Sequence, residues 1–333
     1  MAPNQLPDPA DFDAWTLAEW VEATLLLEEL DGLSRTSFRE RFSAGLEPDQ
    51  PEIERMEAEV RRRALCAPDA YPYRVEGTRV VRPGSMDSTV YDFLLVLSLE
   101  RAPYRKESRF EDINPAFELL TREALLRHLG PGAQAVRFGS PARDDRPAGF
   151  PEAVPWLARK MGLEVGSLSD VDTADNDGGL DVAAWRPFGD GQAAHVAVLA
   201  QCTVEVEYDG KANDIATNEW ARWIAFGRPP MSALAIPFVV PVDAKAWMRL
   251  AGRVDLVLDR MRLVELLDSE SLTAFSEYAA MQAFVESERD ALLTSLASPL
   301  PEGKKRDARP KVARRRKPVR RSSTSKAKTQ ANK

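Results

Sequence analysis

The chain has 333 residues, enough for one large domain or two ordinary ones with a sizeable hydrophobic core. Charged residues make up 29% of the sequence and hydrophobic residues 44%, which excludes wholesale disorder and a collagen-like chain. The formal net charge of −7 is unevenly distributed, because residues 303–333 contain fourteen Lys and Arg against one acidic residue. This tail therefore carries +13 and the other 302 residues carry −20. Any function has to accommodate an acidic body and a polycationic tail.

Cysteine and histidine are scarce. Cys66 and Cys202 are too few for a disulfide framework or a Cys-based zinc site, and His128 and His195 leave few bases for nucleophilic catalysis. No secretory signal is visible, and the longest apolar run, at 93–99, is far too short to span a membrane. We therefore expect a cytoplasmic protein without membrane contact.

Apolar periodicity predicts the elements of the first half of the chain. Residues 11–63 show helical spacing, and the short β-branched segments around 71–82 are typical of strands. Residues 87–101 fit an apolar helix or a buried strand equally well. A further helix is expected from Pro115 to Leu129, where Gly130 and the proline after it end it.

The loop at 139–149 is rich in Gly, Pro and charge and is the predicted domain boundary. The sequence thus predicts a mainly helical domain of unknown role at 1–139, an α/β domain at 140–302 and a disordered polybasic tail at 303–333. The elements expected after the boundary are a helix at 150–161, strands at 180–185 and 194–202, a helix at 213–227, a strand at 234–242 and a helix at 272–297.

Two expected strands contain a polar residue where an apolar one would pack better. Asp181 lies in the first strand and Gln201 near the end of the second. A buried carboxylate is costly unless it is paired, hydrogen-bonded or bound to a metal. If the strands are neighbours, a carboxylate and an amide oxygen meet at one end of the sheet, and such oxygen ligands suit Mg²⁺ or Mn²⁺. The alternative is structural: Asp181 caps a turn and Gln201 bonds to the backbone.

The stretch from Asp177 to Gly191, followed by Val-Leu-Ala-Gln-Cys ending at Cys202, resembles the PD-(D/E)xK restriction-endonuclease-like superfamily, especially its Mrr-like branch. In that superfamily a helix leads into a β-hairpin whose strands supply Asp and then Glu or Gln, and a Lys follows. The resemblance, which covers about residues 150–226, implies that Asp181 is the first metal ligand and Gln201 the second. It also implies that Glu152 is the accessory acid.

The lysine of the motif is missing. Thr203 stands at its position, and the nearest downstream lysine is Lys211, which is either a displaced catalytic lysine or a solvated loop residue. The acidic residues Glu205, Glu207 and Asp209 are either extra metal ligands or a sign of lost activity. In the mechanism that the resemblance implies, the metal activates water and Lys211 stabilises negative charge.

Other candidate residues have ordinary structural explanations. His195 is expected to be an exposed strand-edge residue, and Trp220, Trp223 and Phe226 have the spacing of a helix that faces the core. Four arginines are either phosphate contacts or solvated charges: Arg249, Arg253, Arg260 and Arg262.

The sequence thus predicts a Mg²⁺-dependent endonuclease acting on DNA, in bacterial restriction or antiviral defence, with RNA and a partner subunit as open alternatives. A second reading is an inactive nuclease fold that binds nucleic acid or a partner protein. A third is an interaction protein in which Asp181 and Gln201 are structural. The tail is expected to tether nucleic acid, although it could instead aid solubility or fold back on the acidic body. Its expected phosphate contacts are Lys304, Lys305, Arg306, Arg314, Arg315, Arg316, Lys317, Arg320 and Arg321.

Overall fold

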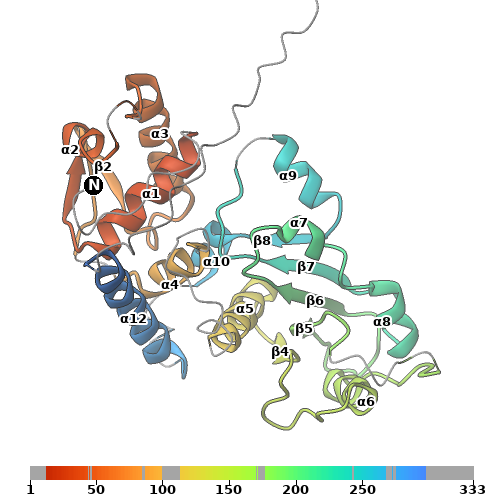
Figure 1. Ribbon diagram of the computed structural model, residues 1–333. Coiled ribbons are helices and arrows are strands. Elements are labelled where there is room, and N and C mark those ends of the chain that lie inside the picture. Colours follow the sequence, from red (N-terminus) through yellow and green to blue (C-terminus); the bar gives the residue numbers. More distant parts are fainter. Residues whose placement is uncertain are drawn as a thin grey trace, which may run out of the picture. The chain divides into compact units, whose positions relative to one another are not determined.

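The structure, a computed structural model, describes residues 13–43, 45, 47–84, 87–99, 113–169, 171, 177–241, 244–267, 272 and 275–297 (Figure 1). All of these residues belong to one compact unit, which covers residues 1–298. The basic tail at 303–333 lies outside the described residues.

The fold is mixed α/β, as the sequence predicts, and the described strands form two sheets. The helices are α1 (Ala14–Leu27), α2 (Arg35–Arg39), α3 (Gln50–Cys66), α4 (Thr89–Ser98), α5 (Asn114–Leu129), α6 (Phe150–Met161), α7 (Tyr208–Lys211), α8 (Thr217–Trp223), α9 (Ala244–Ala251), α10 (Arg260–Leu266) and α12 (Tyr278–Ala297). The strands are β1 (Gly32–Ser34), β2 (Arg74–Glu76), β3 (Arg79–Val81), β4 (Gln134–Arg137), β5 (Val182–Arg186), β6 (Val196–Cys202), β7 (Met231–Ala235) and β8 (Leu256–Leu258).

The larger sheet has the strand order β4-β5-β6-β7-β8. Its first three strands are antiparallel, and β5 and β6 form the hairpin that the sequence predicts, with Val182 opposite Ala200. From β6 onward the strands run parallel, with Gln201 opposite Leu234. The smaller sheet, β1-β3-β2, is antiparallel and lies among the first three helices.

Side chains that alternate along β5 face two different hydrophobic cores. Val182 and Ala184 belong to a large core that also includes buried residues of α1, α4 and α5. Ala183 and Trp185 face a second core, which α6 and α8 complete with an aromatic cluster. The sheet therefore separates two layers of helices, with α5 on one face and α6 on the other.

Local sequence explains several helix ends. Asp13 caps α1 by accepting a hydrogen bond from the Thr16 N–H at 2.8 Å, and Asp49 forms a reciprocal capping box with Glu52 at the start of α3. Helix α6 ends at Gly162, whose φ of +68° is the left-handed conformation that glycine adopts without a steric penalty.

The predicted boundary at 139–149 does not separate two hydrophobic cores. Both β4 and α5 precede it, yet β4 is a strand of the larger sheet, and buried residues of α5 share a core with β5 and β6. Three predicted elements also differ in extent. The helix expected at 213–227 is shortened to α8, the strand expected at 234–242 is replaced by β7 at 231–235, and α12 begins later than the helix expected at 272–297.

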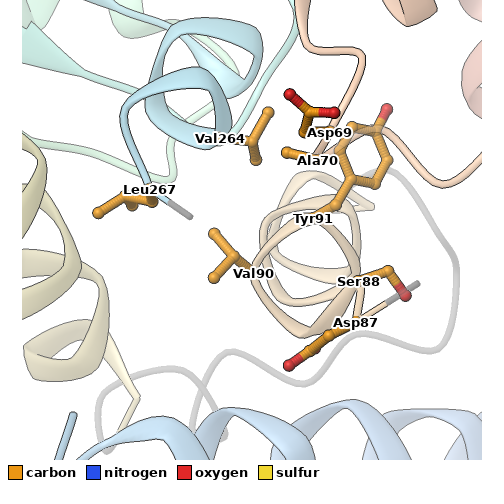
Figure 2. A pocket seen from close by; sticks show the side chains of 8 residues that line it. All are labelled: Asp69, Ala70, Asp87, Ser88, Val90, Tyr91, Val264 and Leu267. Carbon is orange, nitrogen blue, oxygen red and sulfur yellow. The ribbon is translucent and has the colours of Figure 1, made fainter. Parts of the chain in front are cut away.

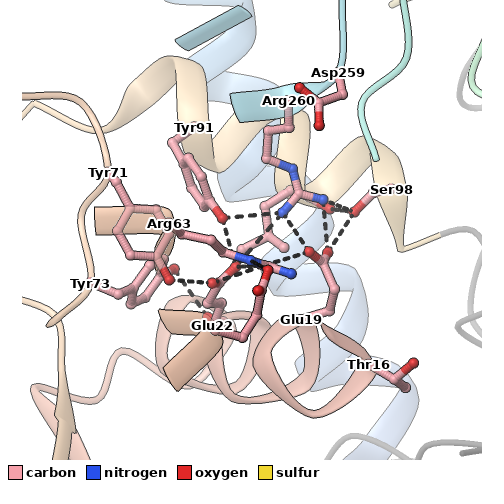
Figure 3. A network of polar contacts seen from close by, with 12 residues as sticks. Thr16, Glu19, Glu22, Arg63, Tyr71, Tyr73, Tyr91, Ser98, Asp259 and Arg260 are labelled. Atoms are coloured by element: carbon pink, nitrogen blue, oxygen red, sulfur yellow. Dashed lines mark hydrogen bonds and ion pairs between the residues drawn. The ribbon is translucent and has the colours of Figure 1, made fainter. Parts of the chain in front are cut away.

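A buried polar network joins α1, α3 and α4 to Arg260, the first residue of α10 (Figure 3). Arg260 donates to Glu19 Oε2 at 2.7 Å and to the Pro237 carbonyl at 2.8 Å. Arg63 lies 3.0 Å from Glu22 Oε1, and the Tyr91 hydroxyl donates to the other oxygen of Glu22 at 2.7 Å. Arg260 is therefore neither the solvated charge nor the phosphate contact that the sequence suggests, because its side chain is fully buried.

Candidate functional site

Asp181 is fixed where strands β4, β5 and β6 meet. Its carbonyl accepts hydrogen bonds from the N–H groups of Phe138 and Gly139, at 2.6 and 3.0 Å, and its own N–H donates to the Ala200 carbonyl at 3.0 Å. Its carboxylate oxygen Oδ2 accepts from the N–H of Cys202 at 2.7 Å. The backbone of three strands therefore sets the position of this carboxylate.

A second carboxylate, Glu118, converges on the same place from α5. A Cβ atom built on Gly139 would lie 2.5 Å from Glu118 Oε2 and 2.9 Å from Asp181 Oδ1. The two carboxylates thus share the space that the missing side chain of Gly139 leaves open. Glu118 is buried and pairs with Arg137, whose Nε lies 2.6 Å from Oε2.

Burial raises the pKa of both carboxyls. For Glu118 the pKa reaches about 8, where the charge of Asp181 adds to the effect of burial and Arg137 opposes it. For Asp181 it reaches about 7, where burial outweighs the lowering by the Cys202 N–H and the charges of Arg137 and Lys211. Both carboxyls therefore lose their protons less readily than solvated acids do, and a cation that binds there would favour their ionised forms.

Gln201 is buried at the end of β6, next to Cys202. Its Nε2 donates to Asp214 Oδ2 at 3.3 Å. Its Oε1 is buried and has no hydrogen-bond partner in the described part of the chain. An unpartnered amide oxygen of this kind is available as a ligand for a hard cation.

Lys211 lies on α7 and is connected to Gln201 through Asp214. Its Nζ is 3.6 Å from Asp214 Oδ2 and 3.4 Å from Glu205 Oε1. Its charge is also one of those that lower the pKa of Asp181. The structure thus brings Lys211 to the same end of the sheet as Asp181 and Gln201.

Thr203, at the position of the expected lysine, is buried and has a structural role. Its N–H donates to the Ala235 carbonyl at 3.0 Å, and its Oγ1 accepts from the Glu205 N–H at 3.1 Å. It extends the contact between β6 and β7 and caps the turn that leads toward α7.

Glu152, the expected accessory acid, lies elsewhere. It is exposed in the first turn of α6, and its carboxylate turns back toward Gly149 at the start of that helix. Glu118 on α5, and not Glu152, lies close to Asp181. The sequence contains a signal that points to Glu118. This residue interrupts the apolar run from Ala116 to Leu120, just as Asp181 interrupts its apolar strand.

The aromatic residues of α8 belong to the core, as predicted. Trp220 and Trp223 are buried against Phe150, and Phe226 lies in the same cluster. His195 is partly exposed, just before β6.

The surface arginines have partners within the chain. Arg249 lies 2.9 Å from the carboxylate of Asp209, and Arg253 donates to the Asp209 carbonyl at 2.6 Å. Arg262 lies over the Trp247 ring.

The donors collected here suit magnesium better than zinc. They are two carboxylates and one amide oxygen, and within the described residues no group of three or more His, Cys, Asp or Glu side chains is arranged to hold a metal. Mg²⁺ binds through one or two carboxylates and keeps several waters, so it does not need such a cage. The free Oε1 of Gln201 and the two carboxylates that crowd together beside Gly139 fit this requirement.

The small pocket in Figure 2 is separate from this site. It lies between α4 and α10 and has room for about one water molecule. None of the residues that line it belongs to the candidate site. The lining residues are Asp69, Ala70, Asp87, Ser88, Val90, Tyr91, Val264 and Leu267.

Comparisons with protein-family models, with curated proteins and with solved structures return no match to this chain. Among the described residues, no helix is long and apolar enough to cross a membrane. The tail residues expected to bind nucleic acid, from Lys304 to Arg321, lie outside the described residues.

Proposed function

We propose that this chain is a Mg²⁺-dependent endonuclease that hydrolyses DNA phosphodiester bonds, in bacterial restriction or antiviral defence. One observation carries the proposal: Glu118 and Asp181 converge on Gly139, next to a strand end where Gln201 has an unpartnered amide oxygen. The hairpin that carries Asp181 and Gln201 also agrees with the resemblance to the PD-(D/E)xK proteins.

Glu118, Asp181 and Gln201 would hold the metal through oxygen atoms. When bound there, Mg²⁺ would polarise the scissile phosphate and lower the pKa of a water ligand. The Cys202 N–H keeps Asp181 in place, and Arg137 keeps Glu118 in place by an ion pair. Lys211, about one-third exposed, can reach negative charge that develops on the phosphate.

A non-catalytic role in binding nucleic acid or a partner is the second candidate. The motif lysine is replaced by Thr203, and Lys211 is already paired with Glu205 and Asp214. If Lys211 does not leave these partners, the site lacks the cation that the mechanism requires.

Plasmid cleavage tests the proposal. The native chain should cut supercoiled DNA with Mg²⁺ or Mn²⁺ at low salt, and both methylated and unmethylated plasmids should be tried. Asp181→Asn and Glu118→Gln should each reduce the rate at least 100-fold, because they remove a ligand charge and keep the side-chain shape. Glu164→Gln, at an exposed acid, is the matched control and should retain the native rate.

The outcomes separate the candidates. DNA binding without cleavage on any plasmid would reject the nuclease and favour the binding role. Cleavage that survives in Asp181→Asn would show that the active site is elsewhere or that the preparation is contaminated.

A further inference from the structure

The contact between Gln201 and Asp214 fixes the orientation of an amide. A carboxylate has no hydrogen to donate, so the group that faces Asp214 Oδ2 at 3.3 Å must be the NH₂ of Gln201. The amide oxygen therefore points away from Asp214, and it is buried without a partner among the described residues.

Asp214 is itself held against the turn that carries Asp181. Its N–H donates to the Lys211 carbonyl at 3.0 Å. A Cβ atom on Gly179 would lie 2.8 Å from the Asp214 carbonyl oxygen, so glycine is required for the turn to approach this closely. The φ of +74° at Gly179 also favours glycine. Asp214 thus packs against the turn before Asp181 and also contacts Gln201 at the end of β6.

The orientation of an amide side chain decides whether an oxygen or an NH₂ group faces a cation, whereas a carboxylate presents an oxygen in either orientation. The two oxygens of a glutamate are equivalent, so either can face a cation. A glutamine presents an oxygen in one orientation and two N–H donors in the other, and the second orientation repels a cation. A site that uses Gln201 as a ligand therefore needs a residue that selects the first orientation.

We propose that Asp214 is a positioning residue that accepts the NH₂ of Gln201 and thereby presents Oε1 to a divalent cation. This inference rests on the proposed function, because it assumes that the site binds a metal. Asp214 also holds Lys211, at 3.6 Å, so one carboxylate orders both the amide ligand and the cationic side chain.

A double-mutant cycle in the full-length chain tests this role, with Mn²⁺ affinity measured by calorimetry in the absence of DNA. The four proteins are the native chain, Asp214→Asn, Gln201→Glu and the double variant. Asn keeps the size of Asp214, but it can bond to the Gln201 amide in either orientation. The loss of the Asp214 charge occurs in both backgrounds, so the difference between them reports the coupling between residues 214 and 201, which includes the repulsion between two carboxylates in Gln201→Glu.

Asp214→Asn should weaken Mn²⁺ binding about fivefold more when residue 201 is Gln than when it is Glu. Equal effects in the two backgrounds would overturn the positioning role and leave the metal site intact. Absence of Mn²⁺ binding in the native chain would instead overturn the proposed function and this inference with it.

A second measurement does not depend on the folding of Gln201→Glu. In protein labelled with ¹⁵N-glutamine, the Gln201 side-chain signal is identified by its loss in Gln201→Ala. Mg²⁺ should shift this signal in the native chain and shift it less in Asp214→Asn. A signal that Mg²⁺ leaves unmoved in the native chain would contradict coordination through Oε1.

Discussion

At the residue scale, the candidate site brings two acidic side chains together at a point where burial opposes their charge. Glu118 and Asp181 lie on different elements and meet at Gly139. Only one cation, Arg137, forms an ion pair with either carboxylate in the described residues. Such an arrangement lowers stability and is typical of functional sites, where shifted pKa values serve chemistry or ligand binding.

The raised pKa of Asp181 predicts how the free energy of unfolding depends on pH. The pKa of Asp181 is about 7 in the folded chain and near 3.8 in the unfolded chain. Between these values the folded chain binds more protons, so the free energy of unfolding falls as pH rises from 4 to 7. Asp181→Asn, which keeps the bond from the Cys202 N–H, should remove this loss and stabilise the chain at pH 8 by about 4 kcal/mol.

Urea unfolding at pH 5 and pH 8 measures this effect. The native chain should lose more stability than Asp181→Asn between the two pH values. Asp190→Asn, at an exposed turn residue, serves as the control and should follow the native chain. If Asp181→Asn has the same pH dependence as the native protein, the Asp181 carboxyl is not protonated in the folded state at pH 5.

Sequence reasoning located Asp181 and Gln201 because each interrupts a short apolar strand. The same criterion also applies to Glu118 on α5, yet a single charge on an amphipathic helix is usually solvated. Its burial depends on packing between α5 and the larger sheet, a long-range contact that helical periodicity does not reveal. Glu152 was a reasonable expectation from the resemblance, but its helix packs on the opposite face.

At the element scale, contacts that are local in sequence were easier to predict than distant ones. The β5–β6 hairpin follows from two alternating segments and the turn between them. The position of β7 depends on parallel pairing with β6, where Met231 lies opposite Val198, and the apolar run alone suggested a later start. The strand ends before Pro237, which has no N–H to donate to a neighbouring strand.

The buried network in Figure 3 makes α10 an element that supports the fold. Arg260→Met would leave Glu19 and Glu22 with Arg63 as their remaining cation in the network. Removal of one partner from a buried ion pair costs about 3–5 kcal/mol, because the charge that remains is desolvated. The free energy of unfolding from urea titration should fall by this amount.

Arg249→Met, at an exposed ion pair on α9, provides the comparison and should change stability by less than about 0.5 kcal/mol. Equal small effects from both substitutions would mean that the chain tolerates the loss of Arg260 by repacking.

At the scale of the whole molecule, the described helices before residue 100 share one core with the larger sheet. The predicted division at residue 139 was based on loop composition, and composition does not report which side chains pack together. A separately expressed segment from 140 to 302 would lack α5, β4 and Glu19, the ion-pair partner of Arg260. Experiments on this protein therefore require the region before residue 140.

The charge distribution leads to the final prediction, which concerns residues 303–333. A body of −20 repels DNA, whereas a tail of +13 can neutralise phosphates and release their counterions. Deletion of 303–333 should weaken DNA binding on every sequence and flatten the dependence of log affinity on log salt, without moving any cleavage position. A shuffled tail of the same composition should restore both properties, because contacts to phosphate require charge and not order. Fluorescence anisotropy from 50 to 200 mM salt provides the measurement. A truncated chain with native affinity and an unchanged salt slope would show that the tail does not tether DNA.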